Sequence, residues 1–368
     1  MGIFLCYNNQ NPFREKEMFE KYLHVFLISM VPMIELRGAI PIATVVYGLD
    51  YWKSLAVCVL GNMLPVPVIY FFAHKVLLWG RDKKYIGKFC TYCIVPYTRG
   101  RERSRKMEDI IAEVRCLKEK GYKQVTLLGQ NVDAYGKDFG DDYAFATLLE
   151  EVAKTGIDRV RFVTPYPSDF RTQVFDVMAK YPNIMPYMHL PVQSGSNSVL
   201  KRMNRRYTRE QYLSIVHELR KRLPDVFLST DIIVGFPNET EEEFQDTLSL
   251  VREVEYDAAY TFIFSPRPGT PAYHMKDEMS DEIKHRHFDE LKKLIDELSA
   301  KRASQFVGKT VDVLFEKISD RDSTKVSGYD PHNKLVHVTG DASLIGQIRK
   351  VKITESHTYS LLGELVDE

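Results

Sequence analysis

The sequence has no excess of either charge. Among its 368 residues, 50 Lys and Arg residues balance 50 Asp and Glu residues, so the formal net charge is zero. A strongly basic chain would indicate nucleic-acid binding through its overall field, and that signature is absent here. Any affinity for RNA must therefore come from local patches of charge.

Cysteine is also scarce, with five residues in the chain. This number is too small, and the spacing too irregular, for a disulfide framework in a protein of this size. The N-terminal sequence lacks a basic region followed by an apolar stretch and a small-residue cleavage site, so we expect no cleavable signal peptide. We expect a reduced, cytoplasmic setting for the C-terminal part.

Charge nearly vanishes between residues 25 and 79. The apolar run from Ser54 to Trp79 is about long enough to cross a bilayer, although one Asn and two Pro residues interrupt it. The segment predicts either membrane contact or a buried amphipathic hairpin in a soluble protein. Its strings VPMIELRGAIPIATVVYGL and VLGNMLPVPVIYFF resemble the small multidrug export protein family, whose members are integral membrane proteins. That resemblance covers about residues 14–89.

From residue 99 onward, amphipathic helices alternate with short apolar strands. We expect a helix over residues 107–120 and strands at QVTLLG, RVRFVT, PYMHLPV, VFLSTDIIVGF and AAYTFIFS. Thr208 with Gln211, and Thr240 with Glu243, predict capping boxes at two helix starts. The alternation predicts an α/β fold with a partial parallel (β/α) barrel of five or six strands.

The C-terminal part changes character again. A charged amphipathic helix is expected over residues 280–304, and beyond Gly308 short strands separated by turns predict a small five-stranded β-barrel. We therefore predict three regions: an apolar, membrane-protein-like helical segment over 1–88, a barrel domain over 89–300 and a small β-barrel over 305–368.

Cys90 and Cys93 are separated by two residues, one of them Tyr92. By itself this spacing fits half a zinc site, a redox pair, iron–sulfur ligation or two buried thiols. The surrounding string KFCTYCIVPYTRGRERSR resembles the cluster loop of the methylthiotransferase subfamily of radical S-adenosylmethionine (SAM) enzymes, which carries C-x-x-x-C-x-x-C. The resemblance implies a [4Fe–4S] cluster on three thiolates, including Cys90 and Cys93, with an open iron that binds SAM. Reductive cleavage of SAM would then supply a 5′-deoxyadenosyl radical.

The chain departs from this family at the first cysteine position, where it has Ile86. Isoleucine offers no ligand atom, and no other cysteine of the chain is an obvious substitute. Most of the family's N-terminal domain is also missing, with the three cysteines of an auxiliary cluster thought to supply sulfur. Two thiolates should hold a cluster poorly. We therefore expect impaired catalysis in a chain that resembles a fusion at the string GKFCTYC.

Three downstream motifs resemble the branch of this subfamily that acts on dimethylallyladenosine in tRNA: TLLGQNVDAYGKD, HLPVQSGSNSVLKRMNRRYT and STDIIVGFPNETEEEF. The resemblance assigns SAM binding to nine residues and leaves the catalytic residues unassigned. The nine are Tyr92, Gly129, Gln130, Asn131, Gln193, Ser194, Arg205, Asp231 and Gly235. Some have plainer alternatives: residues 129–131 fit an ordinary βα turn, Arg205 fits a surface arginine, and Asp231 fits a satisfied core carboxylate.

The final domain resembles the TRAM module, a small OB-like RNA-binding β-barrel. Its Lys and Arg residues are offset by acids, so RNA contact must depend on one face. Lys334, Arg349 and Lys350 are the candidate contacts. The alternative is a structural barrel that caps the catalytic domain.

Two functions remain open. The first is methylthiolation of N6-isopentenyladenosine next to the anticodon of tRNA, with SAM as methyl donor and radical source. That enzyme would work as a cytoplasmic monomer with an electron donor such as flavodoxin or ferredoxin. The second is a catalytically dead RNA-binding remnant, or a membrane-anchored fusion that contacts the bilayer through residues 25–79.

Overall fold

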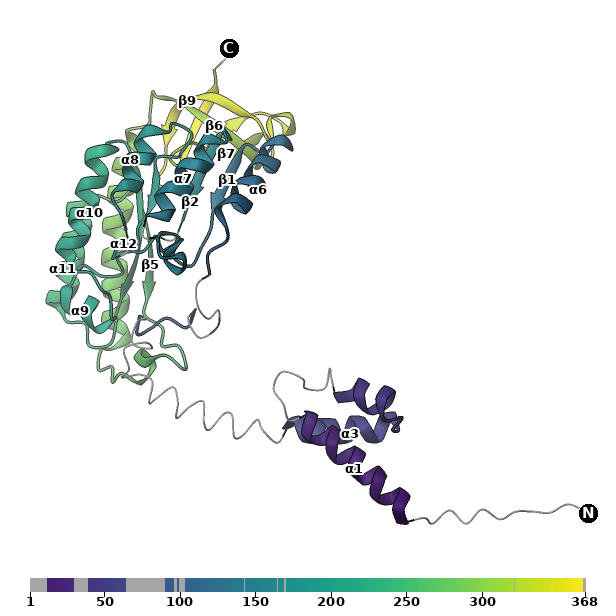
Figure 1. Cartoon of the computed structure of the whole chain (residues 1–368). Helices are drawn as coiled ribbons and strands as arrows, with labels where there is room; N and C mark the ends of the chain where they lie inside the picture. Colours follow the sequence, from purple (N-terminus) through teal and green to yellow (C-terminus); the bar gives the residue numbers. More distant parts are fainter. Residues whose placement is uncertain are drawn as a thin grey trace, which may run out of the picture. The chain divides into compact units, whose positions relative to one another are not determined.

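The chain forms two compact units, Met1–Lys88 and Phe89–Glu368, in this computed structural model (Figure 1). The structure describes residues 12–29, 39–63, 90–95, 98, 103–141, 143–163, 165–168, 170–320 and 322–366. Each unit has its own hydrophobic core.

The first unit is helical, as the sequence predicts. It contains α1 (Pro12–Ser29), the π-helix η1 (Ile42–Val46) and α3 (Tyr51–Met63). A small core of Val25, Ala39, Ala43 and Cys58 is fully buried between them. None of the helices described is both long and apolar enough to span a membrane. Most of the apolar run 54–79 lies outside the described residues.

The second unit contains two parallel sheets. Strand β1 (Gln124–Leu127) pairs with β2 (Arg159–Phe162), and β4 (Phe227–Val234) lies between β3 (Tyr187–His189) and β5 (Ala258–Ile263). A parallel bridge between Val160 and Ile184 lies at the join of the two sheets. These strands confirm the predicted partial parallel barrel.

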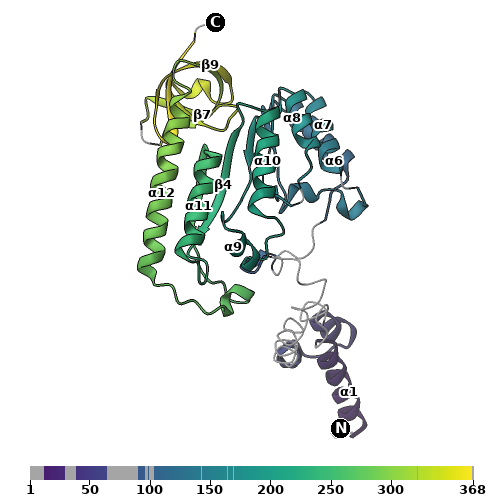
Figure 2. The same cartoon turned by 90° about the vertical axis from the view of Figure 1, so that its left-hand side faces the viewer.

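Helices cover one face of these strands. They are α6 (Met107–Glu119), α7 (Ala144–Lys154), α8 (Gln173–Lys180), α9 (Asn197–Arg202), α10 (Arg209–Arg222) and α11 (Glu241–Val254). Figure 2 shows α10 and α11 running alongside β4. Every second strand residue enters the core beneath them, including Val160, Met188 and Leu228. Both predicted capping boxes, at Thr208 and Thr240, are present.

The last helix, α12 (Asp281–Ser304), leads into a closed barrel of five strands. These are β6 (Thr310–Ile318), β7 (Lys325–Tyr329), β8 (Leu335–Thr339), β9 (Ile348–Ser356) and β10 (Ser360–Leu365), in the order β10-β8-β7-β6-β9. Gly328 permits close approach of β6 and β7, because a Cβ there would lie 2.1 Å from the carbonyl oxygen of Leu314. The predicted small β-barrel is confirmed.

Arg159 joins the small β-barrel to the parallel sheets. Its side chain is buried, and its Nη1 and Nη2 donate to the carbonyl oxygens of Tyr329 (2.7 Å) and Asp312 (2.8 Å). Burial lowers the pKa of the guanidinium, but arginine remains charged at neutral pH. The small β-barrel is therefore held at the N-terminal end of β2 by charge-assisted hydrogen bonds.

Replacing this arginine should cost more than replacing an exposed one. Arg159→Met leaves the carbonyl oxygens of Tyr329 and Asp312 without this charged donor, and we expect a loss of about 2–3 kcal/mol in the free energy of unfolding. Arg105→Met is the control, because Arg105 pairs with Glu113 where both side chains are more than half exposed. That change should cost less than about 1 kcal/mol. Equal losses in urea unfolding would contradict this account of the junction.

Candidate active site

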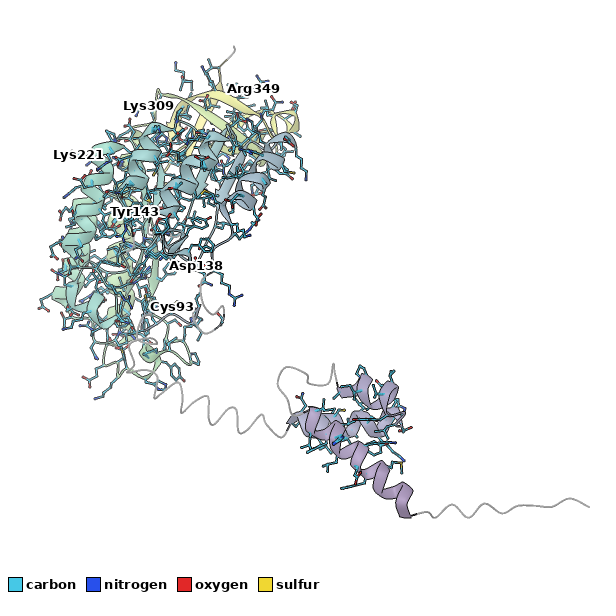
Figure 3. The ribbon with its side chains drawn as sticks, viewed as in Figure 1. Cys93, Asp138, Tyr143, Lys221, Lys309 and Arg349 are labelled. Atoms are coloured by element: carbon cyan, nitrogen blue, oxygen red, sulfur yellow. The ribbon has the colours of Figure 1, made fainter. Side chains whose placement is uncertain are left out.

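The loop that carries Cys90 and Cys93, the cysteine loop, is hydrogen-bonded to the C-terminal end of α9. Thr91 donates from its backbone N–H to the carbonyl oxygen of Met203 (3.0 Å) and from Oγ1 to that of Arg202 (3.0 Å). Its own carbonyl oxygen accepts from the N–H of Ala272 (2.9 Å) in η4 (Pro271–His274). Figure 3 places Cys93 at the opposite end of this unit from Lys309 and Arg349 of the small β-barrel.

Two thiols are available in this loop. Cys90 and Cys93 are half-buried and form no disulfide, and burial raises the pKa of the Cys93 thiol. Among the described residues, no group of three or more His, Cys, Asp or Glu side chains is placed to hold a metal ion. Cys116 is exposed on α6, and Ile86 lies outside the described residues. The donor set seen here is therefore incomplete for a cluster that needs three thiolates.

Arg205 lies in an aromatic cage beside this loop. It donates from Nη2 to the hydroxyl of Tyr92, and its guanidinium carbon lies 5.6 Å, 5.2 Å and 6.0 Å from the ring centres of Tyr92, Tyr166 and Tyr207. Burial raises the pKa of Tyr92, so its hydroxyl stays neutral. The buried Nε of Arg205 has no hydrogen-bond partner among the described residues. Arg205 is therefore enclosed by tyrosine rings, which differs from the ordinary surface arginine that the sequence also allowed.

Gln193 has an unusual backbone at the C-terminal end of β3. Its φ is +70°, a left-handed conformation that is rare for residues other than glycine. Its N–H donates to the carbonyl oxygen of Asp231 (2.8 Å), and its own carbonyl oxygen accepts from the N–H of Ile233 (2.9 Å). Such strain persists only where the surroundings impose it, and it concentrates at functional sites.

Ser194 points toward the helices instead. Its Oγ lies 3.3 Å from Oγ1 of Thr247 in α11 and accepts from the N–H of Ser196 (3.2 Å). The neighbouring Gly195 allows this contact, since a Cβ there would lie 2.5 Å from Cα of Thr247. The hydroxyl of Ser194 therefore has a structural role in the helix packing, whatever else it contacts.

Gly235 forms a turn after β4, next to the acidic Glu239 and the basic Lys284. Its φ is +68°, its N–H donates to Oε2 of the buried Glu239 (2.7 Å), and a Cβ would lie 2.7 Å from Cγ of Lys284. Glu239 Oε2 also lies 3.7 Å from Nδ1 of His287, whose ring stacks on Phe244 at 3.9 Å. The turn is thus supported by a buried Glu–His pair.

The Gly129–Asn131 turn follows β1. It lines a cavity of about 460 Å³ together with apolar residues of α6, including Ile110 and Val114. A Cβ on Gly129 would meet Val132 Cγ1 at 3.4 Å, so no close contact demands glycine there. This cavity shares no lining residue with the Tyr92–Arg205 cluster.

The three candidate RNA contacts have different surroundings. Lys334 is only 7% exposed, and its Nζ lies 4.8 Å and 5.1 Å from the ring centres of Phe227 and Phe306. Burial lowers its pKa. The ammonium group of Lys334 thus faces two protein rings, and its contact with RNA stays a prediction. Arg349 is half-buried and donates from Nε to Gln347 Oε1 (3.0 Å), whereas Lys350 is exposed.

Sequence reasoning missed a second polar group on the strands. His189 lies with Nδ1 3.0 Å from Ser229 Oγ and Nε2 3.5 Å from Asp231 Oδ1. Asp231, a predicted SAM contact, is half-buried beside this ring. Strand alternation was the available signal, because residues of one parity on β3 and β4 must share a face.

Stability should depend on pH through His287. Burial opposes its charged form, but the contact of Nε2 with Glu241 (3.2 Å) and the nearby carboxylate of Glu239 outweigh this and raise its pKa above the ordinary value. The stabilisation by the charged ring is therefore complete below about pH 6.5, the unfolded value, and is lost as pH rises through the higher folded-state pKa. We expect the stability advantage of the unmodified chain over His287→Gln, measured by urea unfolding, to shrink between pH 6 and pH 8. An advantage that grows over this range would contradict the assignment.

Family models match three parts of the chain. The radical SAM superfamily matches residues 87–251, the TRAM domain residues 304–366, and the small multi-drug export protein family residues 35–117. The exporter resemblance is thus confirmed with bounds different from those expected. It overlaps the radical SAM match over residues 87–117, which include most of α6, a helix that packs in the second unit.

Curated relatives share one description. The chain is 53% identical over 295 residues to the tRNA-2-methylthio-N(6)-dimethylallyladenosine synthase of Geobacillus kaustophilus, covering 80% of this chain and 56% of the relative. It is 55% identical over 375 residues to that of Bacillus cytotoxicus, covering 100% of this chain and 72% of the relative.

One solved structure, coproporphyrinogen III oxidase (HemN) from Escherichia coli, described as a radical SAM enzyme, overlaps with a TM-score of 0.43 at 14% identity. The overlap covers 72% of this chain and 64% of that one, and a score this low adds nothing to the assignment. The chain spans little more than half the length of the Geobacillus relative. Sequence identity over most of the Bacillus relative nevertheless shows that the chain belongs to the tRNA-2-methylthio-N(6)-dimethylallyladenosine synthase family of radical SAM methylthiotransferases.

Proposed function

We propose that this chain derives from an enzyme that methylthiolates carbon 2 of N6-isopentenyladenosine next to the anticodon of tRNA. The observation that carries the proposal is the cysteine loop, which is hydrogen-bonded to α9 beside an arginine enclosed by three tyrosine rings. In parallel barrels the C-terminal ends of the strands collect the ligand contacts. The strained Gln193 and the turn at Gly235 both lie at those ends.

The residues near the loop have separate roles in this proposal. Arg205, with its unpartnered Nε inside the aromatic cage, is a candidate for the carboxylate of SAM. Gln193 and Gly235 offer backbone groups at the same strand ends, and Asp231 offers a half-buried carboxylate. Gly129, Gln130 and Asn131 line a cavity at the end of β1 and are proposed as further contacts of SAM.

The activity of this chain is proposed to be impaired. Cys90 and Cys93 supply two thiolates, whereas Ile86 stands where the family's first cluster cysteine is expected. An isoleucine cannot coordinate iron, so the ligand set that would hold the [4Fe–4S] cluster lacks one member. No step of radical chemistry follows from the two remaining thiols. An RNA-binding remnant is therefore the second candidate function, favoured by this substitution.

The partners belong to the same proposal. tRNA is the expected substrate, and an electron donor such as flavodoxin or ferredoxin would be needed by a complete cluster. We propose that the chain works as a cytoplasmic monomer. Membrane contact through residues 25–79 stays a separate proposal, which rests on the exporter-like sequence alone.

Restoring the missing ligand should improve cluster retention. After anaerobic reconstitution with iron and sulfide, Ile86→Cys should retain more iron per chain than the unmodified protein, because a third thiolate completes the set. Cys116→Ser is the control, since this exposed cysteine lies on α6 and should leave iron unchanged. Iron retention by Ile86→Cys that is no higher than that of the unmodified chain would contradict the ligand role proposed for position 86.

RNA binding should depend on the exposed strand β9. Lys350→Ala should weaken binding of an anticodon stem-loop RNA and reduce the slope of log affinity against log salt by about 1, because one phosphate contact is lost. Lys201→Ala is the control, because Lys201 is exposed on α9, the helix that holds the cysteine loop at the opposite end of the unit from the small β-barrel. Fluorescence anisotropy at several salt concentrations measures both, and equal effects would contradict an RNA-binding face on β9.

A further inference from the structure

The strands of the second sheet have an inner face that the helices do not cover. On β3, β4 and β5, the residues Met188, Leu228, Ile232 and Ala259 belong to or pack against the core beneath the helices. Residues of the other parity must point the opposite way. This inner face comprises Tyr187, His189, Ser229, Asp231, Ala258, Tyr260 and Phe262.

Polar groups form a continuous line across the inner face. Oη of Tyr187 lies 3.1 Å from Oγ of Ser229, and the same oxygen lies 3.0 Å from Nδ1 of His189. Nε2 of His189 lies 3.5 Å from Oδ1 of Asp231. Both ring nitrogens are thus occupied, which fixes the orientation of the His189 ring.

Two aromatic side chains on this face are open to solvent. Tyr260 is 57% exposed and Phe262 is 52% exposed. They are two residues apart on β5 and so point the same way, and Tyr260 is paired in register with Asp231. The His189 ring meets the Tyr260 ring edge-on, with centres 5.9 Å apart and an angle of 72°. Large aromatic rings left exposed on an oriented, concave surface are available for stacking.

A cavity connects this face with the small β-barrel. Its volume is about 270 Å³, and its walls include Tyr187, Ser229 and Tyr260 from the inner face and Asn333 and Tyr359 from the small β-barrel. Asn333 also accepts a hydrogen bond from Arg161 of β2. RNA held on the small β-barrel would therefore lie next to the open end of the inner face.

We propose that Tyr260 and Phe262 stack with an unstacked base of the bound RNA, and that His189, held by Ser229 and Asp231, sets the angle of the Tyr260 ring. This inference rests on the proposed function, since it needs the chain to bind RNA. Single-stranded RNA is usually recognised by splayed bases that stack on aromatic side chains. Tyr260 is then a binding residue and His189 a positioning residue.

The test uses the full chain and an anticodon stem-loop RNA with 2-aminopurine in place of the adenosine that follows the anticodon. Fluorescence of 2-aminopurine falls when the base stacks. A second dye at the end of the stem reports binding by anisotropy, independently of the base. Tyr260→Ala removes the ring, Tyr260→Phe keeps it, and Tyr122→Ala is the control because Tyr122 is also 57% exposed but lies in the loop before β1.

We expect the unmodified chain, Tyr260→Phe and Tyr122→Ala to quench the base on binding. Tyr260→Ala should bind about fivefold more weakly or worse, as expected for loss of one stacking contact, and its complex should remain bright. Binding with quenching that is unchanged in Tyr260→Ala would overturn this inference alone. No binding of the stem-loop by the unmodified chain would overturn the RNA-binding part of the proposed function, and this inference with it.

Discussion

The alternation of side chains along parallel strands is the constraint on which the rest of the second unit depends. Because successive residues point to opposite faces, one set enters the core beneath α6 to α11 and the other forms the inner face. The same parallel arrangement brings all the C-terminal strand ends to one edge, where Gln193, Gly235 and the cysteine loop are found. The N-terminal ends meet the small β-barrel through Arg159.

This arrangement separates two tasks along the length of the unit. The proposed cofactor contacts lie at one end, and basic residues of the small β-barrel lie at the other, as Figure 3 shows for Cys93, Lys309 and Arg349. A substrate that spans both ends must be long, and RNA meets that requirement. The inner face, with its exposed Tyr260 and Phe262, lies between them. A cavity is lined by residues of both the inner face and the small β-barrel, which is the physical reason for proposing that both contact the RNA.

Much of this fold could be predicted from the sequence, because its signals are local. The helix periods, the strand runs and the two capping boxes depend on neighbouring residues, and the structure has them where they were expected. Burial was harder to predict. Lys334 is charged and follows a turn, which favours exposure, yet it lies between two rings supplied by distant segments. Arg205 likewise gains its aromatic cage from Tyr92 and Tyr166, which are far away in sequence.

Two sets of contacts could not be predicted from neighbouring residues in the sequence. They are the Glu239–His287 pair and the line formed by Tyr187, Ser229, His189 and Asp231. Each joins elements that only the fold brings together. The positive φ of Gln193 had no sequence signal at all, because glutamine is not a residue that favours the left-handed region. What the sequence did carry without the fold was chemistry: a loop with two cysteines, and isoleucine where the family's first cluster cysteine is expected.

The central claim is that the chain retains the site of a radical SAM methylthiotransferase with an incomplete set of cluster ligands. The most direct measurement is iron content after anaerobic reconstitution of the unmodified chain, with electron paramagnetic resonance of the reduced protein in the presence and absence of SAM. The account predicts far less than one [4Fe–4S] cluster per chain and no signal that responds to SAM. A full cluster whose signal shifts on addition of SAM would contradict it, and would mean that another group replaces the missing thiolate.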